Sequence, residues 1–120
     1  MRDFEEAARG FVAPLPGGGV INNSAGQAVW NLVPYAFIER SEAAPDTVNP
    51  SLWRQCRLVM KGGLFKVVEG LYQVRNADIS NLTIIEGDTG LIIADPLLSA
   101  ETARAALELY YAHRPRKPVV

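Results

Sequence analysis

Two kinds of periodicity follow one another in the second half of the chain. Apolar residues first recur at the three- and four-residue spacing of a helix, at Leu52, Cys56, Val59 and Met60. Asn49 can cap the free amides of this helix, Pro50 is tolerated at its first position, and the glycine pair at 62–63 ends it. The spacing predicts a helix with its apolar stripe, including an inert thiol, buried against the rest of the protein.

After residue 63 the period changes to that of strands. Short apolar runs separated by turn residues predict four strands, at 64–68, 71–75, 82–86 and 91–94. Glu69 and Gly70 join the first two strands as a hairpin, and residues 87–90 form a tight turn before the last strand. That last run, Leu91–Ala94, is continuously apolar, which is typical of a strand buried on both faces.

A second helix is predicted between Ser99 and about Arg114. Ser99 can cap it, and its apolar face is formed by Ala103, Leu107 and Tyr110. Prolines end the helix, and a new apolar run opens at 119–120. A strand, a helix and a new strand form the first part of a β-α-β crossover, whose second strand lies parallel in the same sheet. We therefore expect the chain to be the leading part of a larger domain.

The first 48 residues are less regular. A short helical turn at 3–9 precedes a segment at 13–19, rich in proline and glycine, that predicts extended chain on the surface. Residues 20–30 predict a short peripheral hairpin, and residues 35–46 predict a solvated loop. The sequence thus predicts an extended segment with a hairpin over residues 1–48, and a helix, strands and helix over residues 49–120.

Composition excludes several classes of function. The 120 residues carry 12 basic and 13 acidic side chains, a net charge of −1, so no electrostatic footprint for nucleic acid is present. No apolar run approaches the roughly 20 residues of a membrane-spanning helix. The N-terminal residues show no export signal, and the compartment stays open. With one cysteine, Cys56, and one histidine, His113, an internal disulfide and a Cys/His zinc cluster are both impossible.

Short blocks that follow one another along the chain carry a family resemblance. They are Ala13–Pro16, Val29–Trp30, Asp46–Gln55, Gly63–Phe65, Gly70–Arg75, Asp78–Thr83, Ile85–Gly90 and Asp95–Leu97. In this order they resemble the N-terminal portion of the alkylsulfatases of the metallo-β-lactamase superfamily. One departure is Asn31, where the family pattern has an acidic residue after the tryptophan.

The resemblance implies a mixed α+β fold, the N-terminal part of a metallo-β-lactamase αββα sandwich. It implies a parent enzyme, expected to be a homodimer, that cleaves alkyl sulfate esters with hydroxide activated by two zinc ions. In that family most metal ligands come from a histidine-rich loop after the strand that follows the second helix. This chain reaches only the start of that strand at Val120, so we expect it to bind no metal and to be inactive alone.

The best candidate for a residue near the site is Asp95, at the carboxyl end of the fourth predicted strand. A carboxylate there can accept hydrogen bonds from a neighbouring ligand loop, and the resemblance gives it such a supporting role. The alternative is an aspartate that only shapes the strand-to-helix turn. Asp78, Ser80 and Asn81 lie in a loop that can lean over the site and meet substrate, the alternative being a solvated turn. None of these residues is expected to bind metal or to act on substrate chemically.

Two other functions stay open at this point. The chain can be a short, non-catalytic paralogue that binds a partner through an unpaired sheet edge. It can also be an independent, small β-rich binding module whose likeness to the sulfatases is accidental.

Overall fold

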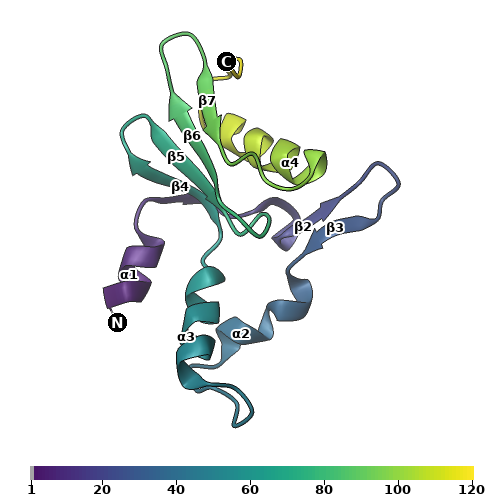
Figure 1. Cartoon of the computed structure of the whole chain (residues 1–120), viewed down its shortest axis with the longest axis vertical. Helices are drawn as coiled ribbons and strands as arrows, with labels where there is room; N and C mark the ends of the chain where they lie inside the picture. The colour runs from purple at the N-terminus through teal and green to yellow at the C-terminus, as the bar shows by residue number, and fades with distance from the viewer. Residues whose placement is uncertain (1) are drawn as a thin grey trace.

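A five-stranded antiparallel sheet with one helix packed on it forms the main body of the protein. The computed structural model describes residues 2–120. The strand order in the sheet is β1-β4-β5-β6-β7, and β2 and β3 form a separate hairpin (Figure 1). The elements in chain order are α1 (Arg2–Ala8), β1 (Phe11–Ala13), β2 (Val20–Asn22), β3 (Ala28–Asn31), α2 (Phe37–Arg40), α3 (Pro50–Val59), β4 (Gly63–Val68), β5 (Leu71–Arg75), β6 (Leu82–Glu86), β7 (Leu91–Ala94) and α4 (Ala100–Tyr111). The predicted α+β fold class is confirmed.

The core lies between the sheet and α4. Strand residues alternate between the two faces of a sheet, and one alternate set points toward α4. The fully buried members of this set include Leu64, Val74, Ile84 and Leu91. From α4, the buried residues are Thr102, Ala106 and Tyr110, four residues apart, so the buried face is rotated from the predicted one, of which only Tyr110 is fully buried.

The segment from 13 to 19 runs along the surface, with Pro14 and residues 16–18 exposed, but it is joined to the sheet more closely than predicted. Its first residue belongs to β1, which pairs with β4, and Ala13 and Leu15 are both buried. The close pairing depends on Gly63, which has a φ of +127° and whose added Cβ would stand 2.3 Å from the carbonyl oxygen of Ala13. The β2–β3 hairpin is confirmed, but it is less peripheral than predicted, since Ile21 belongs to the core.

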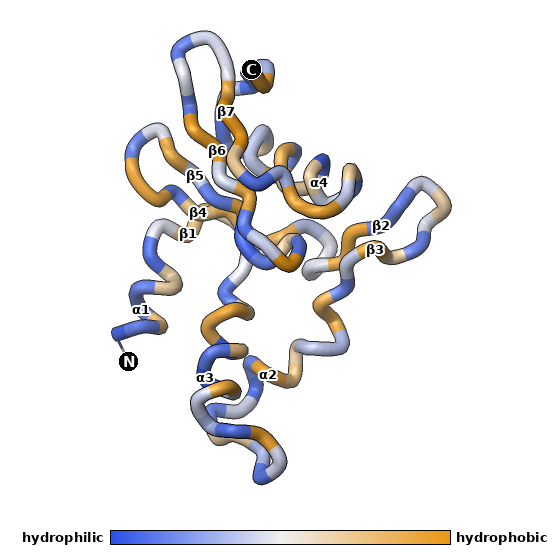
Figure 2. The backbone as a smooth tube through the Cα atoms, viewed as in Figure 1, coloured by the Kyte–Doolittle hydropathy of each residue, from blue (hydrophilic) through white to orange (hydrophobic). Residues whose placement is uncertain are grey.

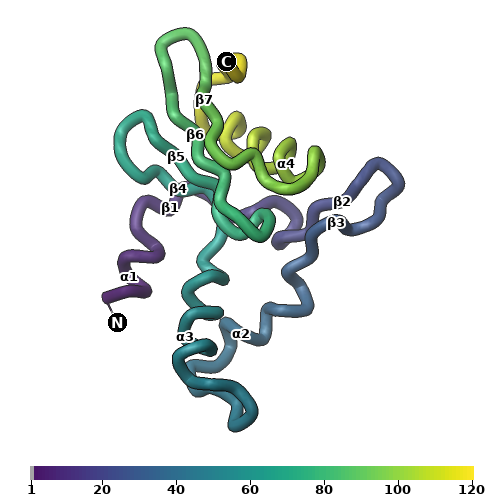
Figure 3. Tube along the Cα trace, viewed as in Figure 1, coloured from purple at the N-terminus to yellow at the C-terminus, as the bar shows by residue number. Residues whose placement is uncertain are grey.

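Residues 33–61, which carry α2 and α3, form an arm that extends away from the sheet (Figures 1 and 3). The predicted helix is confirmed, and the Asn49 side chain accepts hydrogen bonds from two free amides at its start. Its predicted burial is wrong: Leu52 is 58% exposed and Val59 53%, and Trp53 is the buried residue of α3. The predicted loop at 35–46 contains α2, whose Phe37 ring lies 6.0 Å from that of Trp53.

Strand β7 is not buried on both faces. Leu91 is fully buried under α4, whereas Ile92, on the opposite face, is 51% exposed, because no element described here covers that face. The predicted return to the sheet is confirmed, since Val119 bridges Leu91 in parallel orientation. Gly90 permits this approach: an added Cβ would lie 2.6 Å from a methyl group of Val120. Across residues 2–120, no helix has the length and apolarity needed to cross a membrane.

Candidate functional site

Asp95 lies in the exposed loop between β7 and α4, at the edge where the sequence places it. Its φ is +54° and that of Leu97 is +73°, a left-handed conformation that non-glycine residues rarely adopt. The Asp95 carboxylate accepts a hydrogen bond from the Leu97 amide at 3.4 Å and one from the Ser80 hydroxyl at 3.3 Å. Asp95 therefore shapes its own turn, and its proposed support of a ligand loop stays a prediction.

Asp78 binds the loop between β7 and α4 and is not a solvated turn residue. It is buried, and one carboxylate oxygen accepts from the Thr102 hydroxyl at 2.6 Å and from the Leu98 amide at 3.1 Å. The other oxygen accepts from the Ile79 amide at 2.6 Å. Burial raises the pKa of the Asp78 carboxyl, but these hydrogen bonds outweigh it and leave the pKa below its usual value. The charge also lies at the N-terminus of α4, where the helix dipole favours an anion.

The other two predicted loop residues differ from Asp78 in their surroundings. Ser80 is half-buried and reaches Asp95, so it ties the loop at 76–81 to the loop at 95–99. Asn81 is exposed and lines a cavity of about 290 Å³ that opens between this loop, α1 and α3. Ile79, between Asp78 and Ser80, is 73% exposed. Asp78 and the Ser80–Asp95 pair thus join the same two loops through two separate sets of hydrogen bonds, and Asn81 belongs to neither set.

Asn76 anchors the opposite end of the same loop and was missed by the sequence reasoning. Its φ is +61°, and its carbonyl oxygen accepts a hydrogen bond from the indole of Trp30 at 3.0 Å. Within residues 2–120 its buried side-chain nitrogen has no hydrogen-bond partner. Asparagine is the residue that most readily tolerates a left-handed turn, so its position directly after a strand was an available signal.

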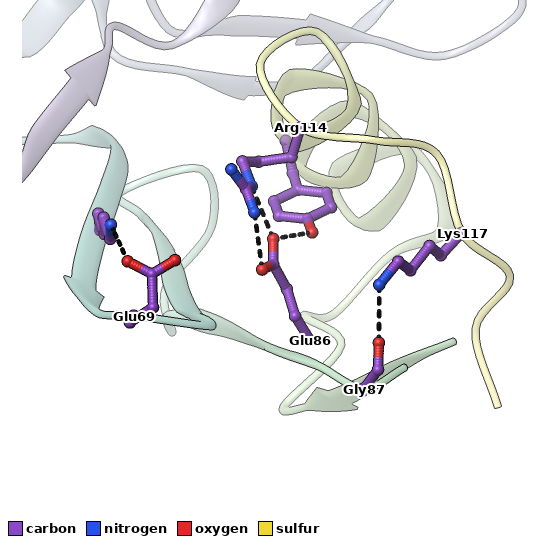
Figure 4. Close-up of polar contacts among 7 residues, drawn as sticks. Glu69, Glu86, Gly87, Arg114 and Lys117 are labelled. Atoms are coloured by element: carbon purple, nitrogen blue, oxygen red, sulfur yellow. Dashed lines mark hydrogen bonds and ion pairs between the residues drawn. The ribbon is translucent and has the colours of Figure 1, made fainter. Parts of the chain in front are cut away.

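The far end of α4 is held by a polar cluster around Glu86 (Figure 4). Arg114 donates to both carboxylate oxygens of Glu86, at 2.7 and 2.9 Å, and the buried Tyr110 hydroxyl donates to one of them at 2.6 Å. The Arg114 guanidinium holds the pKa of Glu86 below its usual value, while burial raises the pKa of Tyr110. Lys117 donates to the Gly87 carbonyl at 2.8 Å, which holds the segment after α4 against the turn before β7. The cluster is structural, and it fixes the end of α4 over β6.

The described residues do not form a metal centre. Among residues 2–120, no three His, Cys, Asp or Glu side chains come together in a way that could hold a metal ion. Cys56 is half-buried on α3, and His113 is exposed beyond the end of α4, so these two potential ligands lie on different parts of the protein. The chemistry of the candidate site is therefore that of a fixed pair of loops that presents the Asp95 carboxylate at a sheet edge.

Comparison with known proteins places this segment among sulfatases. No protein-family model matches the sequence. The linear primary-alkylsulfatase of a Pseudomonas species is 57% identical over 117 residues, which are 98% of this chain and 17% of that protein. The (R)-specific secondary-alkylsulfatase of a Pseudomonas species is 55% identical over 98% of this chain and 17% of that protein. The alkyl/aryl-sulfatase BDS1 of Saccharomyces cerevisiae is 52% identical over 98% of this chain and 18% of its own length.

The fold is shared as well as the sequence. The solved structure of the stereoselective inverting sec-alkylsulfatase Pisa1 from Pseudomonas sp. superposes with a TM-score of 0.90 at 56% identity, covering 98% of this chain and 18% of that one. The chain spans less than a fifth of the length of the relatives that it matches. In sequence and in fold, the chain corresponds to the N-terminal portion of the alkylsulfatases, as its motifs predict.

Proposed function

We propose that the chain serves as the N-terminal part of an alkylsulfatase-like hydrolase that cleaves alkyl sulfate esters. The observation that carries this proposal is the identity of 52–57% with proteins named alkylsulfatases along 98% of the chain. The shared fold, at a TM-score of 0.90, supports it. In the proposed enzyme, the sheet and α4 form one β layer and one helical layer of an αββα sandwich.

In such an enzyme, this chain would position the residues around the site and would not itself react with the substrate. Asp78 and Ser80 hold the two loops together, and Asp95 presents its carboxylate where a neighbouring ligand loop can donate to it. The residues described here do not fit a metal site. The two zinc ions implied by the resemblance would therefore be held by residues outside this chain, and the chain alone is proposed to be inactive.

A chimera tests the proposal directly. This chain replaces the matching segment of the Pseudomonas sec-alkylsulfatase, and sulfate release from a secondary alkyl sulfate is measured for the chimera and for the chain alone. We expect hydrolysis by the chimera only. A folded chimera that binds zinc at the level of the parent and releases no sulfate contradicts the proposal. Light scattering on the same sample measures whether it is the homodimer expected from the resemblance.

The role of Asp95 is tested in the same chimera. We expect Asp95→Asn to lower the hydrolysis rate or the zinc affinity roughly tenfold to a hundredfold, the usual effect of removing a hydrogen-bonding partner of a metal ligand. Asp88→Asn, in the exposed turn before β7, is the matched control and should leave both unchanged. Equal effects of the two substitutions would assign Asp95 only to the turn.

A further inference from the structure

The cavity of about 290 Å³ beside the loop at 76–81 has a wall rich in nitrogen donors. It opens between this loop, α3 and α1, the two helices that lie below the sheet in Figure 1. The nitrogen-bearing side chains that line it are those of Gln55, Lys61, Arg75, Asn76 and Asn81. The cavity therefore brings two cations and three side-chain amides to one small space.

Arg75 is a half-buried cation that forms no ion pair with any carboxylate among residues 2–120. Its Nε donates to the Gln73 side chain at 3.0 Å, and its guanidinium carbon lies 4.2 Å from the centre of the Phe65 ring. Neither contact neutralises the charge, and burial lowers the pKa of Arg75. The other N–H groups of the guanidinium remain able to donate to an anion in the cavity.

Asn76 adds a buried donor to the same wall. The residue is 8% exposed, and its side-chain nitrogen has no hydrogen-bond partner among residues 2–120. The backbone of Gly62 packs directly against it, since a Cβ added there would lie 2.8 Å from the Asn76 Cβ. A buried donor without a partner is unfavourable, and an oxygen of a ligand at this wall would supply the missing acceptor.

The charges around the cavity favour an anion with a single negative charge. Asp78 also lines the cavity, and its two oxygens already accept three hydrogen bonds from the chain. Lys61 lies 3.8 Å from Glu39, and both side chains are exposed, so this pair is weak. The two cations of the lining, Arg75 and Lys61, and the one carboxylate, Asp78, leave a net charge of +1. One negative charge on a ligand balances it.

The rest of the lining is aliphatic. It consists of the side chains of Ala7, Leu58, Val59 and Ile79. Val59 is 53% exposed and Ile79 is 73% exposed, and Figure 2 shows apolar positions of α3 next to hydrophilic ones. Aliphatic surface beside a cation suits a ligand that has an anionic head and an apolar tail, because the tail removes this surface from water.

We infer that this cavity binds a short aliphatic monoanion, with its oxyanion head at Arg75 and its tail along Leu58 and Ile79. An alkyl sulfate and an alkyl carboxylate share this chemistry, since each carries one negative charge at neutral pH. The inference goes beyond the proposed function, because it stands on the cavity and its charges and concerns binding and not hydrolysis. Only a preference for the sulfate head would rest on the proposed function.

Nuclear magnetic resonance titration of the isotope-labelled chain tests the inference. The four probes are hexyl sulfate, hexanoate, inorganic sulfate and hexanol, each added at neutral pH. The backbone amide of Gly62 and the side-chain amide of Asn76 report on the cavity. We expect the two monoanions to shift these signals to saturation, and the tighter of the two identifies the preferred head. Inorganic sulfate, which lacks the tail, and hexanol, which lacks the charge, should bind at least about tenfold more weakly.

Substitutions of the cations locate the binding site. Arg75→Gln should weaken binding of the tighter monoanion roughly tenfold, because it removes the charge that the head contacts. Arg104→Gln removes an arginine from the exposed surface of α4 and is the matched control, which should leave binding unchanged. Lys61→Gln, at an exposed position, decides the question should Arg75→Gln fail to fold.

Three results would overturn the inference. The first is binding of hexanol or inorganic sulfate as tightly as the monoanions. The second is an equal loss in Arg75→Gln and Arg104→Gln, or in Lys61→Gln and Arg104→Gln where the first variant does not fold. The third is the absence of saturable shifts at Gly62 and Asn76 with both monoanions.

The two proposals fail in different ways. Binding of a monoanion by the chain, together with a chimera that releases no sulfate, rejects the proposed function and keeps the binding site. A chimera that hydrolyses its substrate, together with a chain that binds neither monoanion, rejects the binding site and keeps the proposed function.

Discussion

The sheet with α4 and the arm of residues 33–61 are parts of one chain that are held together in different ways. Between the sheet and α4, large side chains such as Leu64, Ile84 and Tyr110 are fully buried, and both ends of α4 are held by hydrogen bonds between side chains. In the arm, Trp53 is the one residue of α2 and α3 that is buried among those described, and the apolar residues Leu52 and Val59 face outward.

The difference teaches that an amphipathic pattern specifies a helix but not the partner of its apolar face. The arm extends the protein, which has a radius of gyration of 15.3 Å, compared with about 13.6 Å expected for a compact chain of this length. Contacts of α3 with α1 are polar or aromatic: Arg54 pairs with Asp3, and the Arg57 guanidinium lies 4.9 Å over the Phe4 ring. The sheet and α4 therefore contain the cooperative core, and the arm depends on weaker local contacts.

The largest effect that separates the two regions is expected from paired leucine substitutions. Leu91→Ala removes a fully buried side chain under α4, which should lower the free energy of unfolding by about 3 kcal/mol. Leu52→Ala removes an exposed side chain from α3 and should change it by no more than about 0.5 kcal/mol. Urea unfolding followed by far-UV circular dichroism measures both. Similar losses at the two positions would show that the arm belongs to the core.

The second effect concerns the loops that the core positions. Asp78→Asn keeps the shape of the side chain but replaces one accepting oxygen with a donor, which faces the Leu98 amide in one orientation of the side chain and the Ile79 amide in the other. A buried donor that faces another donor should lower the free energy of unfolding by about 2 kcal/mol. Asp88→Asn, at an exposed position, is the control and should have almost no effect. A loss at Asp78→Asn no greater than the control would mean that the loop at 95–99 is held by other contacts.

Much of the sheet could be predicted from the sequence because its signals are local. The turns at 69–70 and 87–90 stand between apolar runs of strand length, and the bounds of β5, β6 and β7 agree with the prediction. Burial could not be predicted in the same way. The apolar run of β7 is compatible with cover on both faces, and only the tertiary arrangement decides that Leu91 is buried and Ile92 exposed. β1 was missed because its pairing depends on a distant glycine, Gly63.

The candidate site shows the same limit. The position of Asp95 at the end of a strand is evident from the sequence. The burial of Asp78 depends on Thr102, which lies 24 residues later and becomes its partner only when α4 returns over the sheet. The Glu86 cluster was missed for the same reason, since Arg114 is 28 residues away from its partner. Apolar faces give a periodic pattern in the sequence, whereas polar pairs between distant residues give none.

A smaller effect is expected from acid. The pKa values of Asp78 and Glu86 lie below their usual values in the folded chain, so their charged forms favour folding. Their contribution is complete above the unfolded pKa values of about 4 and is lost as the pH falls through the folded ones. The urea midpoint should therefore decrease between about pH 5 and pH 2. In Glu86→Gln the free energy of unfolding at pH 7 should already be lower by about 1 kcal/mol. The decrease of its urea midpoint in acid should be smaller. Parallel pH curves for the two proteins would contradict the contribution of Glu86.

The smallest effect is expected from a substitution within the arm, and it should be limited to the arm. The Trp53 indole donates a hydrogen bond to the Ser41 carbonyl at 3.2 Å and packs against the Phe37 ring. Trp53→Phe keeps an aromatic ring but removes this bond, at a cost of about 1 kcal/mol. Hydrogen exchange followed by mass spectrometry should show roughly fivefold lower protection of α3 amides, because the arm opens locally. Amides of β5 and α4 should keep their protection, since their exchange depends on opening of the core. If protection falls equally in α3 and in β5, the arm and the sheet unfold as one cooperative unit.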